Sequence, residues 1–213
     1  IDISDVATTI TFNHNDDAAS QQIDLSFMFP FYEQEYNSFI VNPNGWIGFG
    51  DDNSAWDNTA IPSASAPRPA IFGFWDDLNP VNSANSSDMS GYVRFHTNEN
   101  RAVVWFDDVV HWVGSGSVTG TYNFQIVLHK NGDIDLNYAQ MDGNTDSATI
   151  GMQNGDGTLG ITISANSDYA HSQLSTKIIP RAKWLSISPL AALIDPGDSQ
   201  EVLLSFSTAG LDP

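Results

Sequence analysis

Adjacent aspartates at the ends of apolar runs are the residues of this chain best suited to chemistry. Asp76-Asp77 follows the apolar run 70–74, and Asp107-Asp108 follows the run 102–106. Two like charges beside a partly buried strand end are unfavourable unless they are paired or bind a cation. Because Lys and Arg total only seven and Ca²⁺ takes carboxylate and amide oxygens, we predict a stabilising Ca²⁺ ion. The predicted ligands are Asp51, Asp52, Asp57, Asp76, Asp77, Asn79, Asp107 and Asp108.

Two other roles for these carboxylates stay open. Asp76 and Asp77 can cap a turn through hydrogen bonds to backbone N–H groups, as Asp does at the start of many loops. Glycoside hydrolysis instead needs two carboxyl groups about 5 to 9 Å apart in a cleft. The four glutamates lie apart in the sequence, which makes a glycoside hydrolase the less favoured interpretation.

Catalytic motifs are absent from the sequence. The chain has no His-Glu-x-x-His zinc motif, no Gly-x-Ser-x-Gly nucleophile turn and no phosphate-binding loop. It has no cysteine, and its five histidines are scattered without ligand spacing. Asp133-Ile134-Asp135 begins like an EF-hand loop, but Tyr138 stands where that loop needs glycine, so a strand is the better interpretation. We therefore predict that this chain is not an enzyme.

Two tryptophans are the predicted ligand-binding residues. Trp56 lies in a polar stretch, and Trp112 lies just before Gly114-Ser115-Gly116-Ser117. An exposed Trp stacks on a sugar ring or fills a pocket of a partner, because it offers a large apolar area with little entropy to lose. The competing interpretation is that both rings pack onto the protein itself.

The charge balance excludes one class of partner. The formal net charge is -19, and 22 of the 26 acidic residues are Asp. Nucleic-acid binding needs basic patches, and anionic membranes would repel this chain. Asp prefers turns and caps to helices, so the skew favours a loop-rich β protein whose charge is balanced by salt or by Ca²⁺. No apolar run is long enough for a membrane span.

Alternating apolar and polar residues dominate the chain, and no segment keeps a helical rhythm for three turns. Asn131-Gly132 joins two alternating runs and supplies the positive φ angles of a tight hairpin. Many short strands separated by turns predict an all-β, antiparallel two-sheet β-sandwich, jelly-roll-like in type. The predicted strands are 7–13, 22–28, 36–41, 46–49, 70–74, 91–97, 102–106, 122–128, 133–138, 148–152 and 160–164.

The pattern of residues changes near Pro180, and this change predicts two domains. We expect a β-sandwich over residues 1–180 and the first strands of a second module over 181–213, with 177–183 as the linker. About 30 residues cannot close a sandwich that takes ~100, so the second module is expected to be truncated. Because the chain starts at Ile1 instead of Met, we expect a processed or excised piece whose targeting signal is missing from view.

A series of strand-and-turn segments resembles the nidogen-like extracellular domains, and also the accessory domains that follow subtilisin-like proteases in secreted bacterial proteins. The resemblance covers roughly residues 20–165 and contains no catalytic signature. It is carried by Phe29-Pro30-Phe31-Tyr32, Val41-Asn42-Pro43-Asn44-Gly45-Trp46-Ile47-Gly48-Phe49-Gly50, Ile61-Pro62, Ile71-Phe72-Gly73-Phe74-Trp75-Asp76-Asp77-Leu78-Asn79-Pro80 and Gly91-Tyr92-Val93. The tail from Trp184 resembles the opening of an immunoglobulin-like module.

The resemblance implies export and a non-catalytic place beside an enzyme or on a cell surface. Together with the Asp-rich loops it predicts a secreted or cell-surface accessory domain that is stabilised by Ca²⁺. The expected partner is an extracellular protein, a polysaccharide substrate or an adjacent catalytic domain, such as a subtilisin-like protease. The alternative is a carbohydrate-binding or adhesin module that uses Trp56 and Trp112.

Overall fold

The structure is a computed structural model, which describes residues 1–12, 17–32, 34–50, 54–81, 89–113, 120–179, 185–188 and 196–206. The chain divides into two compact units, Ile1–Ile178 and Ile179–Pro213. The larger unit contains every residue that was predicted as a site, so its two sheets are described first.

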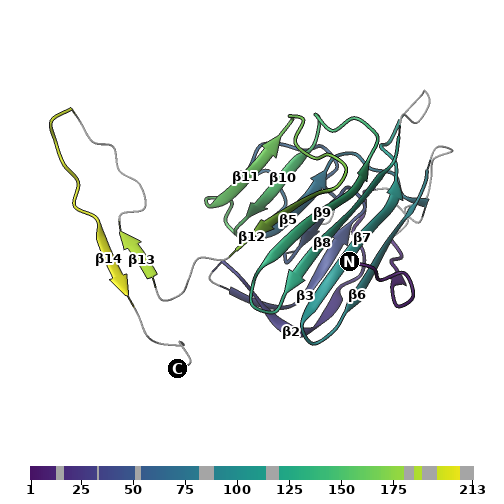
Figure 1. Ribbon diagram of the computed structural model, residues 1–213, viewed down its shortest axis with the longest axis horizontal. Helices are drawn as coiled ribbons and strands as arrows, with labels where there is room; N and C mark the ends of the chain where they lie inside the picture. Colours follow the sequence, from purple (N-terminus) through teal and green to yellow (C-terminus); the bar gives the residue numbers. More distant parts are fainter. Residues whose placement is uncertain are drawn as a thin grey trace. The chain divides into compact units, whose positions relative to one another are not determined.

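The larger unit is built from two six-stranded sheets in which all neighbouring strands are antiparallel (Figure 1). The first sheet has the order β1 (Thr8–Thr9), β6 (Tyr92–Thr97), β7 (Arg101–Val109), β8 (Tyr122–His129), β9 (Ile134–Met141) and β12 (Leu174–Ile178). The second has the order β11 (Gly160–Ala165), β10 (Thr149–Gln153), β5 (Ala70–Trp75), β4 (Trp46–Gly48), β3 (Gln34–Asn42) and β2 (Ile23–Phe31). The predicted all-β antiparallel sandwich is confirmed.

One main core lies between the sheets, because alternate residues of each strand point inward. In β2 the buried positions are Ile23, Leu25, Phe27, Phe29 and Phe31. Aromatic rings join the layers: Phe74 of β5 lies 4.9 Å from Tyr122 of β8, centroid to centroid. The hydroxyl of Tyr138 in β9 donates across the core to the carbonyl of Gly73 in β5 at 2.7 Å. A well-packed core of this kind gives the strands a rigid position.

The outer face of the second sheet is apolar and is covered by the protein's own chain. Trp46, Phe72 and Trp75 form a second buried cluster with Ile61 and Ala66 of the covering segment 54–69. The carbonyl of Ala55 accepts hydrogen bonds from the indole N–H of Trp46 at 3.0 Å and of Trp75 at 3.2 Å. This face is therefore closed to a partner over the covered area.

Gln153 at the end of β10 fixes the same covering segment. Its side chain is fully buried. Its Oε1 accepts from the backbone N–H of Ser63 at 2.8 Å, and its Nε2 donates to the carbonyls of Ser63 at 3.1 Å, Ala66 at 3.3 Å and Pro67 at 2.8 Å. These bonds satisfy backbone groups that a loop buried in this way would otherwise leave without partners.

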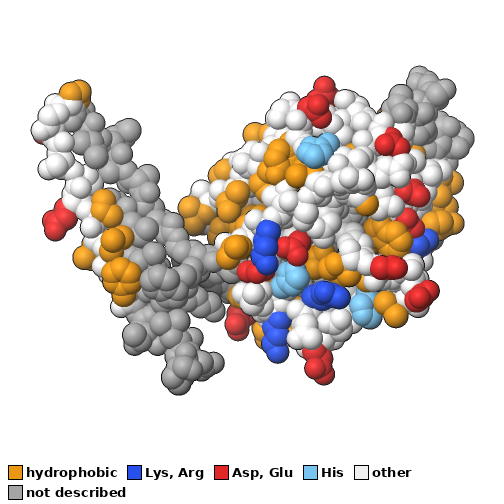
Figure 2. Space-filling view, in the orientation of Figure 1, with side chains coloured by type: hydrophobic (Ala, Val, Ile, Leu, Met, Phe, Trp, Pro, Cys, Tyr) orange, Lys and Arg blue, Asp and Glu red, His pale blue; other side chains and the backbone are white. Residues whose placement is uncertain are grey.

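The outer face of the first sheet is mostly polar. The N-terminal segment covers only one part of it, where Ile3 packs on Val103 of β7 and Val127 of β8. Figure 2 views this side of the molecule, where carboxylates are spread over the surface and several of the few Lys and Arg side chains gather toward the lower ends of the strands. Most of this face remains open to a ligand.

Two predictions about the strands were wrong. Within the described part of the predicted strand 7–13, which ends at Phe12, only Thr8–Thr9 form a strand, β1. Strand β12 was not predicted, and Lys177, assigned to the linker, lies within it opposite Asp135 of β9. Lys177 also forms an ion pair with Asp133 at 2.7 Å, so its charged end stays at the surface while Ile178 is buried.

The smaller unit contains one antiparallel strand pair, β13 (Leu185–Ser188) and β14 (Leu203–Phe206). Leu203, Leu204 and Phe206 are exposed. A two-stranded hairpin is at best marginally stable in water by itself. That this unit opens an immunoglobulin-like module stays a prediction.

Candidate functional site

The predicted acidic ligands after β5 lie at one end of the sandwich, where a short bridge joins the two sheets. Leu78 pairs with His111 in an isolated antiparallel bridge. The backbone N–H of Asn79 donates to the backbone carbonyl of Val110 at 2.8 Å, and the backbone N–H of Trp112 donates to the backbone carbonyl of Asp77 at 2.7 Å. The segments that follow β5 and β7 therefore do meet.

Asp76 is buried, with 5% of its surface exposed, and is surrounded by donors. His111 Nε2 lies 3.1 Å from Oδ1, the Ser147 hydroxyl donates to Oδ2 at 2.5 Å, and the Asp77 backbone N–H donates to Oδ1 at 3.0 Å. The last of these bonds is the turn-capping role that the sequence had left open. Sequence reasoning missed His111 and Ser147 as partners, because both are distant from Asp76 in the chain.

The pKa values of this pair follow from the contacts. Burial by itself would raise the pKa of Asp76, but the hydrogen bonds from His111 and Ser147 and the charge of His111 lower it overall. The hydrogen bond to Asp76 raises the pKa of His111 and outweighs the effect of burial. His111 Nδ1 also lies 2.6 Å from the Trp112 carbonyl. Since a carbonyl and a carboxylate only accept, these two contacts favour the doubly protonated, charged ring.

A Ser, a His and an Asp together invite comparison with a catalytic triad, but the order is different. In a triad the His lies between Ser and Asp and accepts the proton of the Ser hydroxyl. Here the carboxylate of Asp76 lies between Ser147 and His111. The imidazolium has no free lone pair for a proton, so this arrangement stabilises the bridge between the sheets and does not activate Ser147.

The second aspartate pair, Asp107-Asp108, lies at a bulge in β7, between Phe106 and Val109. Both aspartates have protein partners. Asp107 forms an ion pair with Arg94 at 2.6 Å. Burial raises the pKa of Asp107, and the negative charge of Asp108 raises it further. Together these effects outweigh the charge of Arg94, which lowers the pKa. Asp108 is exposed and accepts from Asn123 Nδ2 at 2.9 Å. Each carboxylate thus has a donor from the first sheet.

The remaining predicted calcium ligands differ in their exposure, and two of them lie outside the described residues. Asp57 is exposed, Asn79 is buried, and Asp51 and Asp52 lie outside the described residues. Within the described ranges, no three or more His, Asp or Glu side chains are grouped to hold a metal ion. Calcium binding by these eight residues stays a prediction.

Trp56 and Trp112 are both accessible, with 47% and 40% of their surfaces exposed. Trp56 follows Ala55, which anchors the covering segment of the second sheet. Trp112 follows His111 at the end of the sandwich. Neither of them lines the groove described next, and their role in ligand binding stays a prediction.

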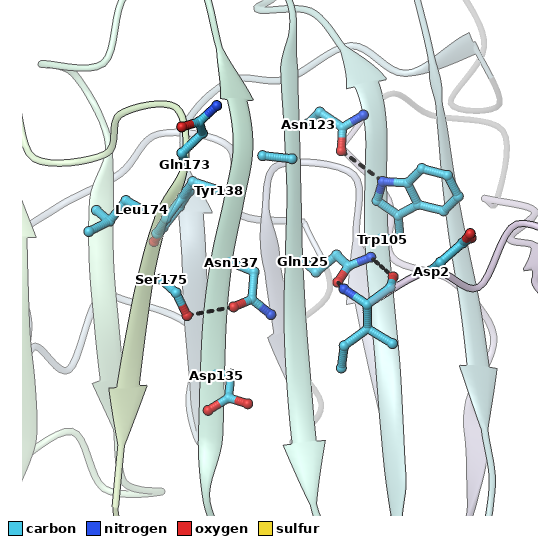
Figure 3. Close-up of a pocket in the computed structure, with 12 residues that line it drawn as sticks. Asp2, Trp105, Asn123, Gln125, Asp135, Asn137, Tyr138, Gln173, Leu174 and Ser175 are labelled. Atoms are coloured by element: carbon cyan, nitrogen blue, oxygen red, sulfur yellow. Dashed lines mark hydrogen bonds between the residues drawn. The ribbon is translucent and has the colours of Figure 1, made fainter.

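A groove of about 590 Å³ lies on the open face of the first sheet (Figure 3). The groove is lined by Asn123 and Gln125 of β8 and by Asp135 and Asn137 of β9. Gln173, Leu174 and Ser175 border it on one side, Asp2 and Trp105 border it on the other, and Ile1 also lines it. Its volume lies within the range of about 300–1,000 Å³ of small-molecule sites. The groove is therefore a candidate binding site on this face.

Strand register aligns the polar residues of the groove in one row. Trp105 of β7 lies opposite Gln125 of β8, Gln125 opposite Asn137 of β9, and Asn137 opposite Ser175 of β12. Residues opposite one another in antiparallel strands point to the same face. The sequence signal was the polar alternation on both sides of Asn131-Gly132, which by itself does not distinguish a binding face from a face that only contacts water.

Hydrogen bonds within the groove hold its side chains in place. Trp105 Nε1 donates to Asn123 Oδ1 at 2.9 Å, and the Ser175 hydroxyl donates to Asn137 Oδ1 at 2.7 Å. Gln125 accepts from the Ile1 ammonium at 2.9 Å and donates to the Ile1 carbonyl at 2.7 Å, as the dashed lines in Figure 3 show. The site is thus organised before any ligand arrives.

Comparison with known protein families relates the sandwich to one of them. The family described as NIDO related matches residues 2–187. The chain belongs to the NIDO-related family. This confirms the nidogen-like resemblance. No curated protein and no solved structure matches the chain.

The family relationship sets coarse limits on function. Nidogen-related domains are extracellular in general and typically non-catalytic. Among the described residues there is no helix with the length and hydropathy needed to cross a bilayer.

Proposed function

We propose that this NIDO-related chain is a non-catalytic accessory domain of a secreted multidomain protein, and that it binds its ligand in the groove on the first sheet. The observation that carries the proposal is the groove itself. Four strands contribute polar side chains that are held by one another, on a sheet fixed by the core. A preorganised site loses little side-chain freedom on binding.

The chemistry of the polar clusters favours binding over reaction. Asp76, the buried carboxylate at the sandwich end, is engaged by His111 and Ser147. Two carboxylates line the groove: Asp135 lies 2.7 Å from His129, and Asp2 accepts from the Ser4 hydroxyl and backbone N–H. General acid–base catalysis needs a proton donor or acceptor aimed at a reacting atom, and carboxylates that already have partners among amides are better suited to hold a ligand.

A binding experiment with product analysis tests the proposal. The purified chain is immobilised and offered soluble extracellular proteins and polysaccharides, and every retained molecule is analysed for cleavage. We expect a retained ligand to be recovered intact, and Asn123→Ala with Asn137→Ala to abolish its retention. Turnover by the purified chain, or retention unchanged by both substitutions, would contradict the proposal.

The secreted context has its own test. We expect the protein that contains this chain to be recovered from the culture medium or from the cell surface when its producing cells are fractionated. Recovery of the mature protein only from the cell interior would contradict this part of the proposal.

A further inference from the structure

We infer that the ligand of the groove is a neutral carbohydrate chain. The inference rests on the proposed binding function and specifies its substrate class. It also moves the sugar-binding surface away from Trp56 and Trp112, which the sequence had suggested, to residues of β7, β8, β9 and β12. Three properties of the groove support it: the spacing of its polar groups, their remaining hydrogen-bond capacity and the charge of the protein.

The row from Trp105 through Gln125 and Asn137 to Ser175 places one polar side chain on each of four adjacent strands. Gln125 is buried, and both ends of its amide bond Ile1, so the members that face a ligand are Asn137 and Ser175 on one side of it and the Trp105 ring on the other. Neighbouring strands are about 4.8 Å apart, and hydroxyls on alternate carbons of a sugar ring are separated by a comparable distance. A short oligosaccharide can therefore contact several members of the row at the same time.

The floor of the groove keeps donors and acceptors for a ligand. Asn137 uses Oδ1 for Ser175, and its Nδ2 has no partner among the described residues. Asp135 accepts from His129 through Oδ2, and its second oxygen remains an acceptor. A hydroxyl group both donates and accepts, so a sugar can satisfy the amide and the carboxylate together.

Apolar surface borders these polar groups. Trp105 lies on one side of the groove and Leu174 on the other, and Ile1, which is bonded to Gln125, also lines it. A sugar ring has hydroxyls around its edge and C–H groups on its faces, so it matches a polar floor between apolar walls. The indole of Trp105 is fixed from within the sheet, since the guanidinium of Arg94 lies 5.4 Å from its centroid and Asn123 accepts from its N–H.

The charge of the molecule decides between neutral and anionic glycans. The formal net charge is -19, and Asp2 and Asp135 both line the groove, whereas no Lys or Arg lines it. Sulfated chains and uronic acid polymers would be repelled, with the strongest repulsion at low ionic strength. A neutral glycan suffers no such penalty.

Calorimetric titration of the whole chain tests the inference. The probes are neutral oligosaccharides of β-linked glucose, mannose, xylose and N-acetylglucosamine, with an oligogalacturonate and an extended acetylated peptide as the alternatives. We expect at least one neutral oligosaccharide to bind and Asn137→Ala to weaken it at least tenfold, because hydrogen bonds to the ligand are lost. Asp135→Asn tests the second floor residue in the same way. Asn37→Ala, at an exposed position of β3, is the matched control and should leave binding unchanged.

The outcomes separate this inference from the proposed function. If only the peptide binds, and Asn137→Ala abolishes that binding, the accessory binding function stands and the carbohydrate assignment falls. If a neutral glycan binds equally to Asn137→Ala and fails to bind Trp56→Ala or Trp112→Ala, the groove is the wrong site. If no probe binds at millimolar concentration, the carbohydrate assignment is overturned. Circular dichroism of each variant confirms that the sandwich is intact.

Discussion

The outer faces of the two sheets are both built from antiparallel strands, but the chain covers one face and leaves a groove on the other. On the second sheet the outward residues include Trp46, Phe72 and Trp75, and the segment 54–69 buries them. On the first sheet the outward residues include Asn123, Gln125 and Asn137, and the face is open as a groove. Alternation decides which residues point outward, but the chemistry of those residues decides whether the chain must cover them.

The comparison extends to individual glutamines. Gln153 on the second sheet is buried and bonds four backbone groups of the covering segment. Gln125 on the first sheet bonds only the two backbone groups of Ile1. Both side chains are buried, but Gln153 fixes a long covering segment, whereas Gln125 holds only the first residue of the chain. The polar side chains next to Gln125, Asn123 and Asn137, stay partly exposed, and such partly exposed amides are a better indicator of a binding face than a polar group buried with all its partners.

Removing a covered tryptophan is expected to have the largest effect. Trp75→Ala should lower the free energy of unfolding by about 3–5 kcal/mol, because it leaves a cavity beneath the covering segment. Trp105→Ala on the open face should cost clearly less, since Trp105 is only partly buried. Urea unfolding of both variants measures the difference. Equal losses would mean that the two faces are packed alike.

The two glutamines give a matched pair. Gln153→Ala should destabilise the protein by about 3 kcal/mol, because buried backbone groups lose their partners. Gln125→Ala should cost about 2 kcal/mol, the order of a hydrogen bond to a charged group, because it removes the bond from the Ile1 ammonium but leaves fewer backbone groups without partners. Both variants can be measured by the same urea titrations. Should Gln125→Ala prove the more harmful, the covering segment would not depend on Gln153 as described.

The Asp76–His111 pair is expected to make stability depend on pH. The raised pKa of His111 stabilises the fold fully below its unfolded value of 6.5, and this contribution is lost as the pH rises through the folded value. The lowered pKa of Asp76 stabilises the fold above its unfolded value of 3.8, and this contribution is lost as the pH falls through the folded value. The pair therefore contributes most between about pH 4 and 6.5.

His111→Asn isolates this contribution. Relative to the native chain it should cost about 2 kcal/mol at pH 5.5, the order of a hydrogen bond to a charged group, and less at pH 9. Unfolding free energies at both pH values give the comparison, and NMR titration of the His111 ring gives its pKa directly. A cost that is the same at both pH values would show that His111 is neutral in the folded protein.

Cations are expected to have the smallest effect. Because the net charge is -19, added NaCl should raise the thermal midpoint by screening self-repulsion. If the rim aspartates bind Ca²⁺ as predicted, CaCl₂ at matched ionic strength should raise it further, and EDTA should reverse that increment. Identical midpoints in NaCl and CaCl₂ would contradict the calcium prediction.

Most of the strands could be predicted because their signals are local. Alternation places Ile134, Leu136 and Tyr138 in the core, and Gly132 adopts the positive φ angle of 94° that the hairpin needs. Strand β12 was missed because Lys177 and the nearby Pro180 suggested a linker. Its pairing with β9 is a long-range contact, and the local sequence of residues 174–178 does not indicate it.

The candidate site was harder to predict because register across several strands creates it. Gln125 and Asn137 could be placed side by side from the hairpin that joins their strands, but Ser175 enters only through β12. Likewise, the pairing of Leu78 with His111 brings His111 to Asp76. Asp76, Asp107 and Asp108, which drew attention in the sequence, have protein partners, whereas amides that the sequence analysis had not singled out line the groove.

The most direct test of the open polar face is an NMR titration of the six tryptophan indole N–H signals with the oligosaccharide that binds best. The account predicts that the Trp105 signal shifts, together with the side-chain amides of Asn123 and Asn137, while the signals of Trp46 and Trp75 stay in place. A shift at Trp56 and Trp112 with none at Trp105 would contradict it.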